Sequence, residues 1–129
     1  MPELLTKTTK LTEYLLLPYD GKKTEFVNGQ IIQMAEPSPL HADIIDFLIV
    51  LFKAHIAEYE LNQVGRTGVG IEIPWIERDN NVRDPDVVVC DREQWRAMRH
   101  LTKAIFCEGN QPGLAIEVAS PRDTSRDTV

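Results

Sequence analysis

Residues 83–90 read RDPDVVVC, and residues 114–120 read LAIEVAS, so each segment combines an apolar run with a carboxylate. A short, β-branched run that is apolar on both faces is typical of a buried strand. Asp86 stands at the entrance of the first strand, and Glu117 is expected inside the second. Because a lone carboxylate on an apolar strand is costly without a partner or a metal ion, both charges require an explanation.

A shared metal ion is one explanation for Asp86 and Glu117. If the two strands are neighbours, the carboxylates converge on Mg²⁺ or Mn²⁺, with water and a backbone carbonyl completing the coordination shell. Such an ion polarises a phosphodiester and lowers the pKa of a bound water molecule. In the alternative, Asp86 caps a turn after Pro85 while Glu117 pairs with an arginine at the sheet edge, and spacing alone favours this alternative.

The segments before residue 60 predict a helix, a hairpin and a second helix. Thr12 caps a short helix, TEYLLL, and the Asn28-Gly29 pair predicts a hairpin with strands at about 24–27 and 30–34. A long helix is expected over residues 41–59, because apolar residues recur at steps of three and four. These residues are Ile45, Leu48, Phe52, Ile56 and Tyr59.

The remaining segments complete an α/β pattern. Pro74 within IEIPWI, residues 71–76, argues for an edge or bulged strand, and Asp91 with Gln94 three residues later predicts a capped helix over DREQWRAMRH. We therefore expect one mixed β-sheet flanked by helices. This sheet would contain the hairpin, the IEIPWI strand and the two strands with acidic residues.

The composition limits the classes of function. The chain has 129 residues, which suits a single domain spanning residues 1–129, and its formal charge of −6 has the wrong sign for a broad nucleic-acid-binding face. Any contact with nucleic acid would be local or metal-mediated. No apolar run approaches the roughly 20 residues that span a bilayer, and no secretory signal is evident, so a cytoplasmic protein is expected. Cys90 and Cys107 lack metal-site spacing and are interpreted as ordinary thiols.

Four segments in this order resemble the Uma2 family, whose description as restriction endonucleases is itself inferred from the fold. They are TEFVNGQIIQM at 24–34, SPLH at 38–41, RDPDVVV at 83–89 and PGLAIEVASP at 112–121. The family is similar to the PD-(D/E)xK phosphodiesterases, so the resemblance implies a restriction-endonuclease-like core that binds a divalent metal ion. Asp86 then matches the acid of the PD half-motif, and Glu117 matches the acid of the E-x-K half-motif.

The resemblance also assigns less specific roles to Glu25 and His41. Glu25 matches an acidic residue of the family and would serve as a further ligand or orient a water molecule. His41 matches the histidine that opens the family's long helix, where it would contact a phosphate or tune the pocket. A histidine at a helix start is more often a cap or a packing residue, and we favour that role.

One departure from the pattern concerns catalysis. Ala119 stands where the E-x-K half-motif has its lysine, and no lysine follows it in the chain. In the family, a lysine on the next helix takes that role after a segment like SPRDTSRDTV, in which Asp127 resembles the preceding aspartate. Asp123 and Asp127 could equally cap or solvate a helix start. We therefore predict a domain that is incomplete at its carboxyl end, with an uncovered sheet edge that favours a homodimer.

These observations leave two hypotheses for function. The first is a Mg²⁺- or Mn²⁺-dependent endonuclease acting on DNA, with a lysine supplied by residues absent from this sequence, so that this chain alone is inactive or incomplete. The second is a non-catalytic binding or structural protein that keeps the fold. A hydrolase without a metal ion is set aside, because the sequence offers no Ser-His-Asp or Cys-His set.

Overall fold

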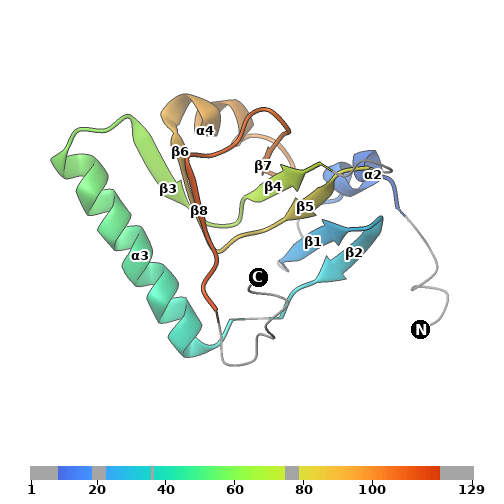
Figure 1. The fold of residues 1–129 in the computed structure, drawn as a ribbon, viewed down its shortest axis with the longest axis horizontal. Coiled ribbons are helices and arrows are strands. Elements are labelled where there is room, and N and C mark those ends of the chain that lie inside the picture. Colours follow the sequence, from blue (N-terminus) through green and yellow to red (C-terminus); the bar gives the residue numbers. More distant parts are fainter. Residues whose placement is uncertain (1–8, 19–22, 36, 75–78, 120–129) are drawn as a thin grey trace.

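The computed structural model describes residues 9–18, 23–35, 37–74 and 79–119 (Figure 1). Helices and strands alternate in it, which confirms the predicted α/β class. In chain order the elements are α2 (Leu11–Leu16), β1 (Thr24–Val27), β2 (Gln30–Gln33), α3 (Pro39–Glu58), β3 (Gln63–Arg66), β4 (Gly70–Ile73), β5 (Asn81–Arg83), β6 (Val87–Asp91), α4 (Arg92–Met98), β7 (Ile105–Phe106) and β8 (Leu114–Ile116).

Within the described residues the strands form two sheets, where the sequence predicted one. A five-stranded sheet has the order β2-β1-β5-β4-β7, and a three-stranded sheet has the order β3-β6-β8. The five-stranded sheet is mixed, because β4 pairs with β7 in parallel and with β5 antiparallel. The chain changes sheet between β5 and β6 at Pro85, which lacks the N–H that a continuous ladder requires. Asp86, directly before β6, and Glu117, directly after β8, therefore lie at the three-stranded sheet.

The hairpin is confirmed with the predicted turn. Asn28 and Gly29 both have positive φ, 53° and 78°, as a two-residue hairpin turn requires. Thr24 pairs with Gln33 and Val27 with Gln30. The hairpin thereby fixes the backbone around Glu25, on the strand next to β5.

The long helix is confirmed, with a start two residues earlier than expected. Ser38 is its N-cap and accepts a hydrogen bond from the N–H of His41 at 3.2 Å, and Pro39 opens the first turn. The side of α3 that packs against β3 and β6 is at least half-buried and carries four of the predicted residues, Ile45, Leu48, Phe52 and Ile56. The fifth, Tyr59, is 61% exposed, so its assignment to the packed side is wrong.

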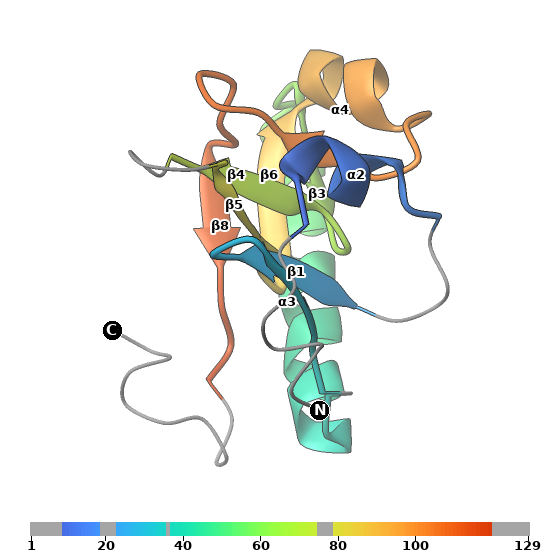
Figure 2. The same ribbon diagram turned by 90° about the vertical axis from the view of Figure 1, so that its right-hand side faces the viewer.

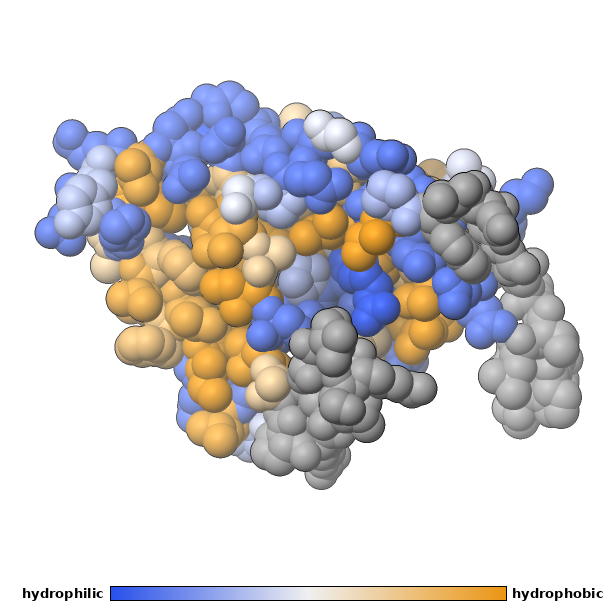
Figure 3. All heavy atoms as spheres, in the orientation of Figure 1, coloured by the Kyte–Doolittle hydropathy of each residue, from blue (hydrophilic) through white to orange (hydrophobic). Residues whose placement is uncertain are grey.

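Large apolar side chains also lie on the outer side of α3. Leu40, Phe47 and Val50 are each more than 60% exposed. Figure 3 shows apolar residues gathered along α3. In Figure 2 the helix lies at the level of the β1–β2 hairpin, below α4. No helix in the described ranges has both the length and the apolar character to cross a membrane.

Two local predictions are wrong. Strand β4 is not at an edge, since it lies between β5 and β7, and Pro74 follows its last residue instead of interrupting it. The rest of IEIPWI, including Trp75, lies outside the described residues, as do Asp123 and Asp127.

The predicted cap of the first helix is also wrong. Helix α2 begins at Leu11 after Lys10, so Thr12 lies inside the helix. The Leu11 N–H donates instead to Asp79 Oδ2 at 2.7 Å.

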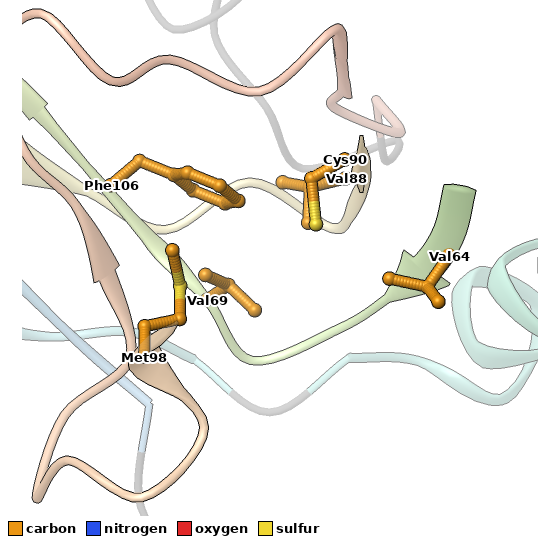
Figure 4. Close-up of a cluster of buried hydrophobic side chains, with 6 residues drawn as sticks. All are labelled: Val64, Val69, Val88, Cys90, Met98 and Phe106. Carbon is orange, nitrogen blue, oxygen red and sulfur yellow. The ribbon is translucent and has the colours of Figure 1, made fainter. Parts of the chain in front are cut away.

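A buried cluster holds β6 in place. Figure 4 shows side chains from β3, β6, α4 and β7 meeting in one cluster, formed by Val64, Val69, Val88, Cys90, Met98 and Phe106. Cys90 packs there as an ordinary buried thiol, as predicted, and Cys107 is exposed. Where β6 ends, the start of α4 is capped as expected, with the Asp91 N–H donating to Gln94 Oε1 at 2.9 Å. This packing fixes the strand whose entrance carries Asp86.

A candidate metal centre at the ends of two strands

The two segments with acidic residues are neighbours, as the metal hypothesis required. Strands β6 and β8 are antiparallel, and Val87 pairs with Ile116. The N–H of Asp86 donates to the carbonyl oxygen of Ile116 at 2.9 Å, so Asp86 and Glu117 leave adjacent strand ends together. Glu117 is not inside a buried strand as expected, because β8 is a short edge strand that ends at Ile116 and Glu117 is exposed.

Asp86 is 7% exposed and is surrounded by donors. Its Oδ2 accepts a hydrogen bond from the N–H of Val118 at 2.6 Å and lies 3.1 Å from His41 Nε2, and its Oδ1 accepts from Lys23 Nζ at 3.3 Å. Burial alone would raise the pKa of Asp86, but the Val118 N–H, the His41 ring and the Lys23 ammonium together lower it. Asp86 is therefore held as an oriented carboxylate.

Asp84, which the sequence interpretation did not single out, is in the opposite state. Its pKa is raised from 3.8 to about 7, chiefly by burial; Lys23 opposes the shift, and Glu25, Glu117 and Asp86 contribute to it. Its Oδ1 is buried and has no hydrogen-bond partner among the described residues. Two aspartates flanking one proline are the signal that could have identified it, because both then leave the same turn.

Glu117 and Glu25 complete the acidic group. Loss of surrounding water and then repulsion from Asp86 raise the pKa of Glu117. Glu25 is 5% exposed, with Oε1 3.1 Å from Arg83 Nε and Oε2 accepting the N–H of Asp84 at 2.7 Å. The prediction that Glu25 lies near the pocket fits its influence on the pKa of both Asp84 and Glu117. Its own oxygens anchor the turn between β5 and β6.

The side-chain nitrogen atoms of His41 and Lys23 both contact the carboxylate of Asp86. The helix-capping side chain is that of Ser38, so the His41 ring is free of that role and reaches Asp86 from the first turn of α3. Lys23, directly before β1, was not predicted, because the E-x-K half-motif places its lysine after the glutamate. Its signal was its position two residues before Glu25, in the same segment that carries the family resemblance.

These side chains border a cavity of about 1310 Å³. Lys23, His41, Asp84, Asp86 and Glu117 line it together with apolar side chains that include Met34, Ile45 and Ile105. In Figure 3, hydrophilic residues lie beside the apolar surface of α3. A cavity of this kind, with a few converging polar groups and shifted pKa values, is typical of a binding or catalytic site.

The donor set fits a hard divalent cation. The carboxyl groups of Glu25, Asp86 and Glu117 raise the pKa of Asp84, and those of Asp86 and Glu25 raise the pKa of Glu117. Among the described residues, Lys23 pairs with Asp86 and Arg83 pairs with Glu25. Carboxylate oxygens are the ligands that Mg²⁺ and Mn²⁺ prefer, and the partnerless Asp84 Oδ1 is one more oxygen available to an ion. Within the described ranges, no three His, Cys, Asp or Glu side chains already stand as a ligand set. Binding would therefore require these side chains to turn.

Comparison with known proteins identifies the fold. The fold is shared with a solved structure from Anabaena variabilis ATCC 29413, described as "a putative nuclease belonging to DUF820", with a TM-score of 0.67 and 18% sequence identity. The alignment covers 92% of this chain and 63% of that one, so the present chain spans less than two thirds of its relative. The molecule therefore has a nuclease-like α/β fold.

The sequence itself places the chain in a family. Residues 11–129 match the Uma2 family, described as "Putative restriction endonuclease". The match covers most of the chain, and the protein belongs to the Uma2 family. No curated protein matches it. The resemblance inferred from four short segments is thereby confirmed.

Proposed function

We propose that this chain forms the metal-binding part of an endonuclease that hydrolyses phosphodiester bonds in DNA, with Mg²⁺ or Mn²⁺ held by Asp86 and Glu117. The observation that carries the proposal is the meeting of these two residues at adjacent strand ends, beside a third carboxyl group with a buried, partnerless oxygen. The family description supports a phosphodiester substrate.

The residues would divide the work according to their surroundings. Asp86, fixed by Val118 and His41, supplies an oriented carboxylate on the buried side of the site. Glu117, exposed at the end of β8, supplies a second carboxylate on the solvent side. A divalent ion bound there would polarise the phosphodiester and lower the pKa of a bound water molecule.

Asp84 adds a group that can exchange a proton near neutral pH. Its pKa of about 7 means that its carboxyl group changes charge in the range where a general base operates. The net charge of −6 disfavours broad contact with DNA, so a local contact at the cavity is the arrangement that this chain permits.

Calorimetric titration with Mn²⁺ and Mg²⁺ tests the ion site. We expect Asp86→Asn and Glu117→Gln each to weaken Mn²⁺ binding at least tenfold, since each removes a charged ligand. Glu58→Gln, an exposed position at the end of α3, is the matched control and should bind Mn²⁺ like the unmodified chain. Nicking of supercoiled plasmid in Mg²⁺ on the same samples tests the reaction.

A non-catalytic protein is the second candidate, and a specific observation favours it. The oxygens of Asp86 already accept from Val118, His41 and Lys23, and Ala119 replaces the expected lysine. If the Mn²⁺ affinity is unchanged in both carboxylate variants and the plasmid stays intact, the protein is non-catalytic. Mn²⁺ binding lost in both, with plasmid nicked by the unmodified chain, would establish the nuclease.

A further inference from the structure

Lys23 reaches the acidic site from a different part of the chain than the expected lysine. It directly precedes β1, and its carbonyl oxygen accepts the N–H of Met34 at 2.8 Å, which extends the hairpin by one pair. Its Nζ lies 3.3 Å from Asp86 Oδ1, and its side chain is 34% exposed. The backbone of Lys23 is thus fixed while its ammonium group stays accessible from the cavity.

The Lys23 ammonium group contacts one carboxyl group and acts electrostatically on two others. Lys23 lowers the pKa of Asp84, Asp86 and Glu117, although these residues lie on the turn before β6 and after β8. The other cationic side chains near the cavity have different partners. Arg83 pairs with Glu25, and Lys103 lies over the ring of Tyr14, 5.0 Å from its centroid.

We propose that Lys23 supplies the cationic contact to the substrate phosphate that the E-x-K half-motif would otherwise provide from the position of Ala119. The inference rests on the proposed function and adds a residue to the same site. A phosphate bound between Asp86 and Glu117 would lie beside the Lys23 ammonium, which carries three N–H donors and can bond to Asp86 and phosphate together. A fixed cation there would offset the charge that develops on the phosphate oxygens.

A merely structural lysine would behave differently. If Lys23 served as counter-ion for Asp86 alone, its removal would free the carboxylate and alter the metal ion's affinity, without a direct effect on DNA. A phosphate contact instead affects DNA binding while the carboxylate ligands stay in place. The two roles are separated by measuring metal affinity and DNA affinity independently.

The experiment compares the unmodified chain with Lys23→Met, Lys23→Arg and the control Lys53→Met, an exposed lysine on α3. Fluorescence anisotropy measures the affinity for a DNA duplex with Ca²⁺ in place of Mg²⁺. Calorimetry measures Mn²⁺ affinity, and plasmid nicking in Mg²⁺ measures activity. Far-ultraviolet circular dichroism confirms that each variant is folded.

We expect Lys23→Met to weaken DNA binding about tenfold and to slow nicking by about 10²-fold, the scale of a lost transition-state contact. Its Mn²⁺ affinity should be unchanged or higher, Lys23→Arg should recover part of both losses, and Lys53→Met should change DNA affinity less than threefold. The inference is overturned if the unmodified chain binds DNA no better than Lys23→Met, or if Mn²⁺ affinity falls in parallel with DNA affinity.

Failure of the proposed function would look different. In that case Asp86→Asn and Glu117→Gln would bind Mn²⁺ like the unmodified chain, whatever Lys23→Met does. If Mn²⁺ binding depends on both carboxylates but DNA binding does not depend on Lys23, the proposed role of Lys23 is wrong and the proposed metal site stands.

Discussion

Asp84 and Asp86 flank the same proline, yet the structure places their carboxyl groups in opposite electrostatic states. Asp86 accepts from the Val118 N–H, the His41 ring and the Lys23 ammonium, and its pKa is lowered. Asp84 keeps a buried oxygen without a partner among the described residues, and its pKa is raised to about 7. Both leave one turn, so the difference arises from what the neighbouring elements bring to each.

This difference separates Asp86, a carboxylate that its neighbours already orient, from Asp84, which keeps an oxygen without a hydrogen-bond partner among the described residues. Asp86 is oriented by contacts from three segments and would hold its place with or without an ion. Ionised Asp84 destabilises the fold, because burial and three neighbouring carboxyl groups disfavour its charged form. Costs of this kind persist at functional sites, where a ligand can relieve them.

Asp86→Ala should have the largest effect on stability. It leaves the Val118 N–H without its acceptor and Lys23 and His41 without their carboxylate, and breaking a buried pair costs about 3 kcal/mol. Urea unfolding at pH 7.5 measures the change in the free energy of unfolding. Asp43→Ala, exposed on α3, should stay within about 0.5 kcal/mol. A loss below about 1 kcal/mol for Asp86→Ala would show that these contacts do not anchor it.

Asp84→Asn should have the opposite sign. The folded-state pKa of about 7 exceeds the value of 3.8 expected on unfolding, so the folded chain holds a proton that the unfolded chain releases between these pH values. Asp84 therefore costs nothing below about pH 4, and its cost grows until about pH 7 and is fully present above it. The shift sets a ceiling of about 4 kcal/mol, and we expect a gain of about 2 kcal/mol at pH 8.

Urea unfolding of Asp84→Asn and the unmodified chain at pH 4 and pH 8 checks this sign. The gain in unfolding free energy should be present at pH 8 and absent at pH 4. An equal gain at both pH values would mean that the asparagine acts through packing or hydrogen bonding, and not through the removal of a charge.

The sequence predicted the elements whose signals are local. Asn28-Gly29 specified the hairpin, the apolar spacing over residues 41–59 predicted α3, and Asp91 with Gln94 marks the start of α4. The family motifs predicted that Asp86 and Glu117 would meet. These features depend on residues within a few positions of one another or on a recognised pattern.

The features that the sequence did not predict depend on contacts between distant segments. Pro74 predicts an edge strand, but β7, more than thirty residues later, pairs with β4. Lys23 and Asp84 belong to the site because of residues on other elements. Lys23, for example, pairs with Asp86, which lies 63 positions later in the chain. Burial of a polar atom without a partner, as at Asp84 Oδ1, is likewise a property of the assembled fold.

Glu25→Gln tests whether the acidic neighbours set the state of Asp84. The substitution removes the charged pair with Arg83 and weakens the bond from the Asp84 N–H, which should cost about 1–2 kcal/mol. It should also lower the pKa of Asp84, because Glu25 raises it. Carboxyl-carbon NMR titration measures this pKa, with Glu108→Gln, an exposed position, as control. An unchanged pKa would mean that Glu25 does not contribute to the shift at Asp84.

Among these variants, His41→Ala should have the smallest effect on the free energy of unfolding. It removes one of the groups that hold Asp86 as a carboxylate. Loss of the His41 contact leaves Val118 and Lys23 at Asp86, so the pKa of Asp86 should rise. A lowered pKa stabilises the fold above the unfolded-state value, and this stability is lost as pH falls through the folded-state pKa. The acid-side loss should therefore begin at higher pH in the variant, with a decrease of about 1 kcal/mol at pH 6. Urea unfolding from pH 3 to 7 checks this shift against His55→Ala, whose ring packs on Tyr59 at the other end of α3. Identical acid limbs for the two variants would mean that the His41 ring contributes no stabilisation to ionised Asp86.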